Sequence, residues 1–101
     1  HEMGSEAKFL YAEQLYKREQ YTTAEQEIMN FIEQNTPHQY WLARSFVLLA
    51  DIYVKQGDDF QAKQYLLSLK ENYKGDDDIA PAIQERLAAI AARDAKKVAN
   101  E

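Results

Sequence analysis

Hydrophobic positions recur with a helical period along most of the chain, and the most apolar stretch lies in its middle. Within residues 40–54, only Arg44, Ser45 and Asp51 are clearly polar. A helix with so little polar surface must be covered by other elements on most of its sides. We therefore expect a central helix that ends at a C-cap formed by Gly57, with the rest of the chain arranged around it.

Three other segments have the period of amphipathic helices. The first begins at Glu6 and ends in the polar stretch 17–20, and the second ends near residues 35–36. A further segment, residues 59–73, follows the central helix. Its apolar residues fall on one face at helical spacing, namely Ala62, Leu66, Leu69 and Tyr73.

A fifth helix is expected after Gly75 and the three aspartates of residues 76–78. Negative charge at that place meets the positive end of the helix dipole. Pro81 lies in the first turn, where a missing amide proton costs little. Beyond Ala91 the segment is rich in Ala and Lys, so we expect it to extend into solvent.

Polar residues before the helices predict how each one begins. Residues 22–25, Thr-Thr-Ala-Glu, have the spacing of a capping box, in which a Thr hydroxyl caps the helix and the Glu reaches back. Thr36 is expected to cap the central helix, with Pro37 at its first position. One of the aspartates at 58–59 is expected to cap the fourth helix.

The sequence repeats at an interval of 38 residues, which aligns Leu10 with Leu48, Lys17 with Lys55, Gln26 with Gln64 and Glu33 with Glu71. The same shift superimposes small residues, which let helices approach closely. In the first helix of each unit these are Ala12, Ala50 and Ala88, and in the second helix Ala24 and Ala62. We expect the first three alanines to mark equivalent close contacts in three successive units.

The small residues, twelve apart within each helix pair, make the chain resemble the tetratricopeptide repeat. That family's motif places a small residue and then a bulky one in the first helix, and an Ala followed by a bulky residue in the second. The matching residues are Ala12, Leu15, Ala24 and Ile28 in one unit and Ala50, Tyr53, Ala62 and Leu66 in the next. Residues 20–24 and 57–62 resemble the family's turn between helices, and the resemblance covers about residues 6–93.

Two features depart from the family pattern. The usual period is about 34 residues, so we expect residues 39–42 to add one turn at the start of the central helix. The third unit lacks a second helix, and family members often end on such a single capping helix. Extended units of this kind resemble those of tetratricopeptide-like proteins of bacterial cell envelopes, and the chain looks like the final piece of such an array.

The predicted fold is all-α, a short right-handed α-solenoid of five helices. It consists of two tetratricopeptide-like hairpins, residues 6–36 and 37–75, and a C-terminal capping helix, residues 76–101. Each hairpin cannot bury its apolar face alone, so the units stack. Residues 1–5 have no periodicity and are expected to be disordered or the remnant of a tag.

In such a stack the first helices line an inner wall, which implies a candidate groove for a peptide. On the central helix the inward positions are spaced by four, three and four residues, and the 38-residue shift extends this stripe to its neighbours. The candidate groove residues are Glu13, Lys17, Arg44, Leu48, Asp51, Lys55, Arg86 and Arg93, and Glu6, Leu10, Ala82 and Ala89 complete the three stripes.

The candidate groove is mixed in charge, and Lys17, Lys55 and Arg93 are expected to form a basic row along one edge. Such a surface suits an extended or helical peptide with acidic groups near that row. The alternative is that these residues are solvated side chains without a ligand. The carboxylate clamp of some family members is not expected, because Phe9 and Glu13 occupy its first-unit positions.

Composition narrows the class of partner. The chain has 101 residues, 46% of them hydrophobic and 29% charged, which is typical of one folded domain or a piece of one. Its net charge of −5 disfavours a nucleic-acid backbone or an anionic membrane as the main partner. No apolar run reaches the roughly 20 residues that span a bilayer, and the absence of cysteine leaves the redox compartment open. The compartment is therefore not predicted beyond the bacterial cytoplasm or cell envelope that the resemblance implies.

Residues with metal-binding or catalytic potential are few. The aspartates at 76–78 lack the alternating spacing of a calcium loop, and His38 has no Cys or second His nearby. Glu13 and Asp51 are the one pair of carboxylates on neighbouring helices that acid–base chemistry could use, and nothing in the sequence indicates a shifted pKa. We therefore expect no enzyme activity, no metal and no cofactor.

The function that the sequence favours is a non-catalytic scaffold that binds a protein or peptide. The alternative is a structural segment that caps or dimerises a larger array, with self-association through an apolar surface of Leu10, Tyr11 and Leu15. A helical domain of an enzyme is a third hypothesis. The aromatic pair Tyr40 and Trp41 either packs on the preceding hairpin or serves as an exposed anchor.

Overall fold

The computed structural model describes residues 3–100, which form five helices and contain no strand. The helices are α1 (Ser5–Lys17), α2 (Tyr21–Glu33), α3 (Gln39–Lys55), α4 (Asp59–Asn72) and α5 (Ile79–Ala99). The prediction of an all-α chain with five helices is therefore confirmed for the described residues. Ser5 belongs to α1 although residues 1–5 were expected to be disordered, and residues 1, 2 and 101 lie outside the described part.

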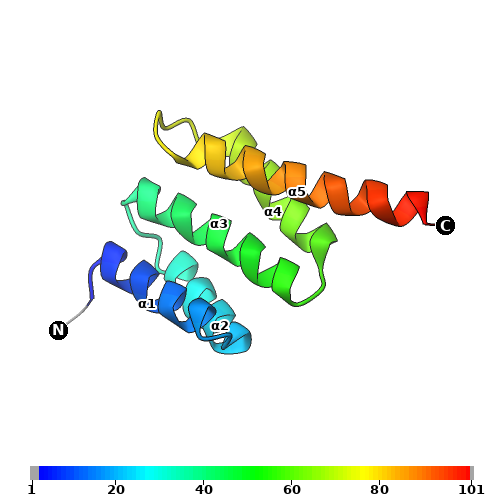
Figure 1. Ribbon diagram of the computed structural model, residues 1–101. Helices are drawn as coiled ribbons and strands as arrows, with labels where there is room; N and C mark the ends of the chain where they lie inside the picture. Colours follow the sequence, from blue (N-terminus) through cyan, green and yellow to red (C-terminus); the bar gives the residue numbers. More distant parts are fainter. Residues whose placement is uncertain (1–2, 101) are drawn as a thin grey trace.

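The helices alternate in direction along the chain, so that α1, α3 and α5 run the same way and α2 and α4 run back (Figure 1). The helix α3 packs against all four others, whereas α2 contacts only α1 and α3, and α4 contacts only α3 and α5. This places α3 in the middle, as its sparse polar surface predicted. It contributes seven buried residues, more than any other helix.

Two hydrophobic clusters make up the core, one on each side of α3. The first joins α1, α2 and α3 and contains Phe9, Ile28, Leu49 and Ile52, among others. The second joins α3, α4 and α5 and contains Val47, Leu66, Ile79, Ile83 and Ile90, among others. Burying one Leu or Ile side chain contributes roughly 1.5–3 kcal/mol, so each cluster is a main source of stability.

The turns after α1 and α3 have the same backbone geometry. Gly57 has a φ angle of 83°, and Glu19, 38 residues earlier, has a φ angle of 61°. In both turns the next amide donates to the carbonyl five residues back, at 2.9 Å after α1 and 2.8 Å after α3. These are the left-handed residue and the six-to-one bond of a Schellman cap, so the predicted cap at Gly57 is confirmed.

The starts of α2 and α4 agree only in part with the caps predicted from the sequence. The side chain of Asp58 accepts a bond from the amide of Gln61 at 3.1 Å, which confirms the cap of α4. The capping box at residues 22–25 is wrong, because α2 begins at Tyr21 and its first turn receives no side-chain bond. The tight turn at Glu19 leads the chain directly into α2, and this turn decides where the helix begins.

The start of α3 also differs from the expected cap. The hydroxyl of Thr36 accepts a bond from the amide of His38 at 3.2 Å, but Pro37 precedes the helix, which begins at Gln39. Residues 39–42 form the first turn of α3, as expected from the long repeat interval. In the 38-residue register they extend α3 beyond the start of α1.

The three alanines of the repeat do not lie at equal depths. Ala12 and Ala50 are 0% and 1% exposed, and each shares a buried cluster with the fully buried alanine of the next helix, Ala24 or Ala62. Ala88, in contrast, is exposed. The expectation of three equivalent contacts is wrong for Ala88, because no described helix folds back over α5.

The last part of α5 extends past the other helices (Figure 1). All residues from 91 to 100 are exposed, which confirms that the Ala- and Lys-rich end projects into solvent. Arg93 pairs with Asp59 at the start of α4, and beyond it the helix is maintained by local hydrogen bonds and by helix-forming side chains.

Candidate functional site

The predicted groove residues lie on α1, α3 and α5, the three helices that run side by side (Figure 1). Most of their charged side chains are only partly exposed and form ion pairs with one another or with a neighbouring helix. The structure therefore brings the candidate residues together, but it uses most of the charges to connect helices.

Arg44 is the most connected of these residues. Its guanidinium lies 3.8 Å from the carboxylate of Glu13 on α1 and 3.8 Å from that of Asp78 at the start of α5. The group also lies 4.7 Å from the ring centre of Phe9 and donates a bond of 3.0 Å to the hydroxyl of Tyr40. A delocalised guanidinium can stack on rings and pair with carboxylates at once, so Arg44 links α1, α3 and α5.

A second ion pair joins α3 to α5. Arg86 donates two parallel bonds to the carboxylate of Asp51, at 2.7 and 3.0 Å. A third bond, from the same guanidinium to the carbonyl of Ala82, fixes its orientation. The bonds to Asp51 raise the pKa of Arg86. Both carboxylates considered for acid–base chemistry, Glu13 and Asp51, thus face a guanidinium.

The predicted basic row is not uniform. Arg93 donates to the carboxylate of Asp59 at the start of α4, at 2.8 and 3.4 Å, so its charge is paired with α4. Lys17 lies 3.7 Å from Glu13 and remains well exposed, and Lys55 is exposed without an ion pair in the described part of the chain. Two members of the row, Lys17 and Lys55, are therefore open to a partner.

Leu48 does not line an open surface, and its assignment to the groove is wrong. It is 5% exposed and belongs to the cluster that joins α1, α2 and α3. The spacing along α3 correctly placed it beside Arg44 and Asp51. However, the cluster that it forms with residues of α1 and α2 buries the leucine.

Aromatic side chains fill the helix interfaces. The ring of Trp41 lies 5.7 Å from that of Phe9, which confirms packing on the preceding hairpin for Trp41. Tyr40 packs instead on the cluster of α3, α4 and α5 and donates a bond to Asp78, so the expectation is wrong for Tyr40. Tyr53 stacks on Tyr65 of α4 and donates a bond of 3.3 Å to the carboxylate of Glu25. Burial, and then the charge of Glu25, raise the pKa of Tyr53 to about 12. These contacts connect α3 to α1, α2 and α4.

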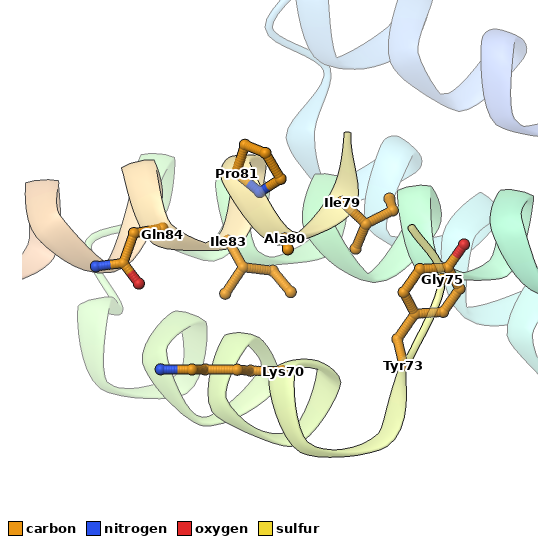
Figure 2. Close-up of a pocket in the computed structure, with 8 residues that line it drawn as sticks. All are labelled: Lys70, Tyr73, Gly75, Ile79, Ala80, Pro81, Ile83 and Gln84. Atoms are coloured by element: carbon orange, nitrogen blue, oxygen red, sulfur yellow. The ribbon is translucent and has the colours of Figure 1, made fainter. Parts of the chain in front are cut away.

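Hollows in the surface lie between α4 and α5, away from the predicted groove. One of about 360 Å³ lies between the end of α4 and the start of α5 (Figure 2). Another of about 430 Å³ continues along the two helices, and Gln84 lines both. This surface was not predicted from the sequence, although the third unit lacks the second helix that would cover it.

The aspartates at 76–78 act at the start of α5. Asp77 accepts bonds from the hydroxyl of Tyr73 and from the amide of Ile79, and Asp78 accepts a bond from the hydroxyl of Tyr40. Within residues 3–100 no group of three or more metal-ligating side chains lies together. None of the described helices combines the length and hydrophobicity needed to cross a membrane.

Comparisons of the chain with protein-family models, with curated proteins and with solved structures found no match. The resemblance to the tetratricopeptide repeat therefore depends on the residues of this chain alone.

Proposed function

We propose that the chain is a tetratricopeptide-like module, a short right-handed α-solenoid with two helix hairpins and a capping helix. Three features support this assignment. Two turns 38 residues apart share one Schellman geometry. The buried pairs Ala12 with Ala24 and Ala50 with Ala62 recur in register. Finally, α2 and α4 contact the helices before and after them but not each other within the described chain.

The proposed function is non-catalytic binding of a protein or peptide on the surface formed by α1, α3 and α5. The observation that carries the proposal is the set of ion pairs from Glu13 through Arg44 to Asp78, and from Asp51 to Arg86. These pairs hold three helices in fixed positions, so the surface is ordered before a partner arrives. A preordered surface loses less conformational entropy on binding.

Lys17 and Lys55 are the residues that we expect to attract the partner, because they are exposed at equivalent ends of α1 and α3. The test is affinity capture with the purified chain as bait, comparing wild type with the double variant Lys17→Glu, Lys55→Glu. Lys70→Glu with Lys74→Glu, at exposed positions on α4 and just after it, is the matched control, because neither residue belongs to α1, α3 or α5. A specific partner should be lost with the first variant and kept with the second.

Two results would contradict the proposal. The first is identical capture by the wild type and the Lys17, Lys55 variant, with both equally helical by circular dichroism. The second is that wild-type bait retains no partner under conditions that preserve its fold. Arg93 is left unchanged in this test, because its loss would also break the pair with Asp59.

A structural role in a larger array is the second candidate, and a specific observation favours it. Leu10 and Tyr11 on α1 are 44% and 45% exposed, which is unusual for neighbouring large apolar residues. Leu15, the third residue of that expected surface, is buried in the core. Sedimentation of the wild type and of the double variant Leu10→Glu, Tyr11→Glu distinguishes this role from partner binding. Self-association predicts that the wild type forms an oligomer and that the double variant is a monomer.

A further inference from the structure

The hollows between α4 and α5 form one trough with an apolar floor. We define the α4–α5 trough by the floor residues Leu67, Leu87, Ala88 and Ala91. Leu67 is 39% exposed, and Ala88 and Ala91 are exposed, so apolar surface is open along its length. From Pro81 to Asp94 the trough follows α5 for about 20 Å, the length of a helix of about 13 residues.

The trough is the counterpart, 38 residues later, of the surface that α4 covers on α3. On α3, the ring of Tyr65 from α4 packs on Phe46 and Tyr53, with ring centres 6.0 and 5.6 Å apart. Ala62 of α4 lies buried in the same cluster as Ala50. The equivalent positions on α5 are Gln84, Ala88 and Ala91. The trough on α5 therefore corresponds to the face of α3 that binds α4, and we expect it to accept a helix.

The walls of the trough indicate the charge of that helix. Lys63 and Lys70 line the α4 side, seven residues and therefore two turns apart on one face. Both are exposed, and neither forms an ion pair with any other described residue. Asp94 is the one acidic residue that lines either of the two hollows. Carboxylates along one flank of a bound helix would complement the two lysines.

We propose that the α4–α5 trough binds an acidic amphipathic helix of a partner protein. The apolar stripe of this helix packs on the floor, a small residue crosses Ala88, and two acidic residues about two turns apart face Lys63 and Lys70. Such binding would use the helix-in-groove mode, in which apolar anchors supply affinity and flanking charges select the partner. It is a separate site from the surface of α1, α3 and α5.

The probe is a fluorescent, hydrocarbon-stapled peptide with the sequence of residues 21–33, the segment that forms α2. This sequence has three Glu, no basic residue and a small residue, Ala24, which shares a buried cluster with Ala12. A control peptide carries Gln in place of the three Glu. Fluorescence anisotropy at low salt should give a Kd of about 10–100 µM for the acidic peptide and about tenfold weaker binding for the control.

Substitutions in the protein then locate the site. Lys63→Glu with Lys70→Glu should weaken the acidic peptide by about tenfold, and Ala88→Arg should abolish the binding of both peptides. Ala91→Arg serves as a second floor variant, and circular dichroism checks that each variant keeps its helices. Lys17→Glu with Lys55→Glu should leave peptide affinity unchanged, which distinguishes this site from the proposed function.

Several outcomes would overturn the inference. Two results would reject the trough as a helix site. The first is that the wild type does not bind the peptide at 1 mM. The second is that Ala88→Arg and Ala91→Arg both bind it with wild-type affinity. Loss of binding in the Lys17, Lys55 variant would assign the peptide to the other surface. A concentration-dependent dimer that Ala88→Arg dissociates would make a second copy the occupant in place of a partner protein.

Discussion

At the scale of single residues, two left-handed positions show how the repeat is built. Glu19 and Gly57 end α1 and α3 with the same hydrogen bonds, but only one of them is glycine. An L-residue in this conformation places its Cβ too close to a carbonyl oxygen, at a cost of roughly 1–2 kcal/mol. The first turn therefore contains a local strain that the second turn avoids.

We expect Glu19→Gly to stabilise the protein by about 0.5–1 kcal/mol. Glycine removes the left-handed strain, and the greater freedom of the unfolded chain offsets part of the gain. For a domain of this size, 1 kcal/mol corresponds to a shift in Tm of about 4–8 °C. Thermal unfolding followed by circular dichroism measures the shift.

Gly57→Ala is the matched control in the equivalent turn. An added Cβ at Gly57 meets no atom within 4 Å, so the backbone conformation alone decides the effect. This variant should lose about 1 kcal/mol. A lower Tm for Glu19→Gly, or no effect of Gly57→Ala, would contradict the argument.

At the scale of the elements, ion pairs fix the positions of neighbouring helices. Asp51 and Arg86 are 35 residues apart in sequence, partly buried, and joined by two parallel bonds. Such bidentate pairs are stronger than ordinary surface pairs, which contribute about 0.2–1 kcal/mol. The pair therefore connects α5 to α3 with a specific register.

We expect Asp51→Asn and Arg86→Gln each to destabilise the protein and to be coupled by about 1 kcal/mol. The reason is that each single change leaves a partly buried charge without its partner. Urea unfolding of the wild type, both single variants and the double variant gives the coupling. A coupling below about 0.3 kcal/mol would mean that the pair does not hold the two helices.

The helices were predictable from the sequence because their signals are local. The apolar period, Gly57 and Asp58 correctly indicated α3, α4 and the turn between them. The capping box before α2 was misleading, because the Schellman turn at Glu19 set the start of that helix.

The candidate surface was predictable only in outline. Spacing correctly placed Arg44 and Asp51 on one face of α3, but their carboxylate and guanidinium partners lie on other helices. Leu48 lies on the same stripe but is buried. The crossing angle of two helices decides which residues of a stripe are covered, and the sequence does not give this angle. The α4–α5 trough likewise depends on what packs against α5, which periodicity alone does not indicate.

At the scale of the whole molecule, stability depends on α3 being covered from both sides. One cluster closes with α1 and α2, and the other closes with α4 and α5. Because α3 belongs to both, loss of either side exposes residues of the shared helix. The described helices should therefore unfold together in one transition.

Shortening the chain from its C-terminus tests this dependence. Removal of residues 95–101 should change the Tm by less than about 2 °C, because residues 95–100 are exposed and the pair of Arg93 with Asp59 is retained. Removal of residues 76–101 also takes away Ile79, Ile83 and Ile90, each at most 3% exposed. At roughly 1.5–3 kcal/mol per side chain, the loss of about 5–9 kcal/mol is comparable to the whole stability of a small domain. The longer deletion should therefore abolish cooperative unfolding in calorimetry, and a sharp transition near the wild-type Tm would show that α1 to α4 fold without α5.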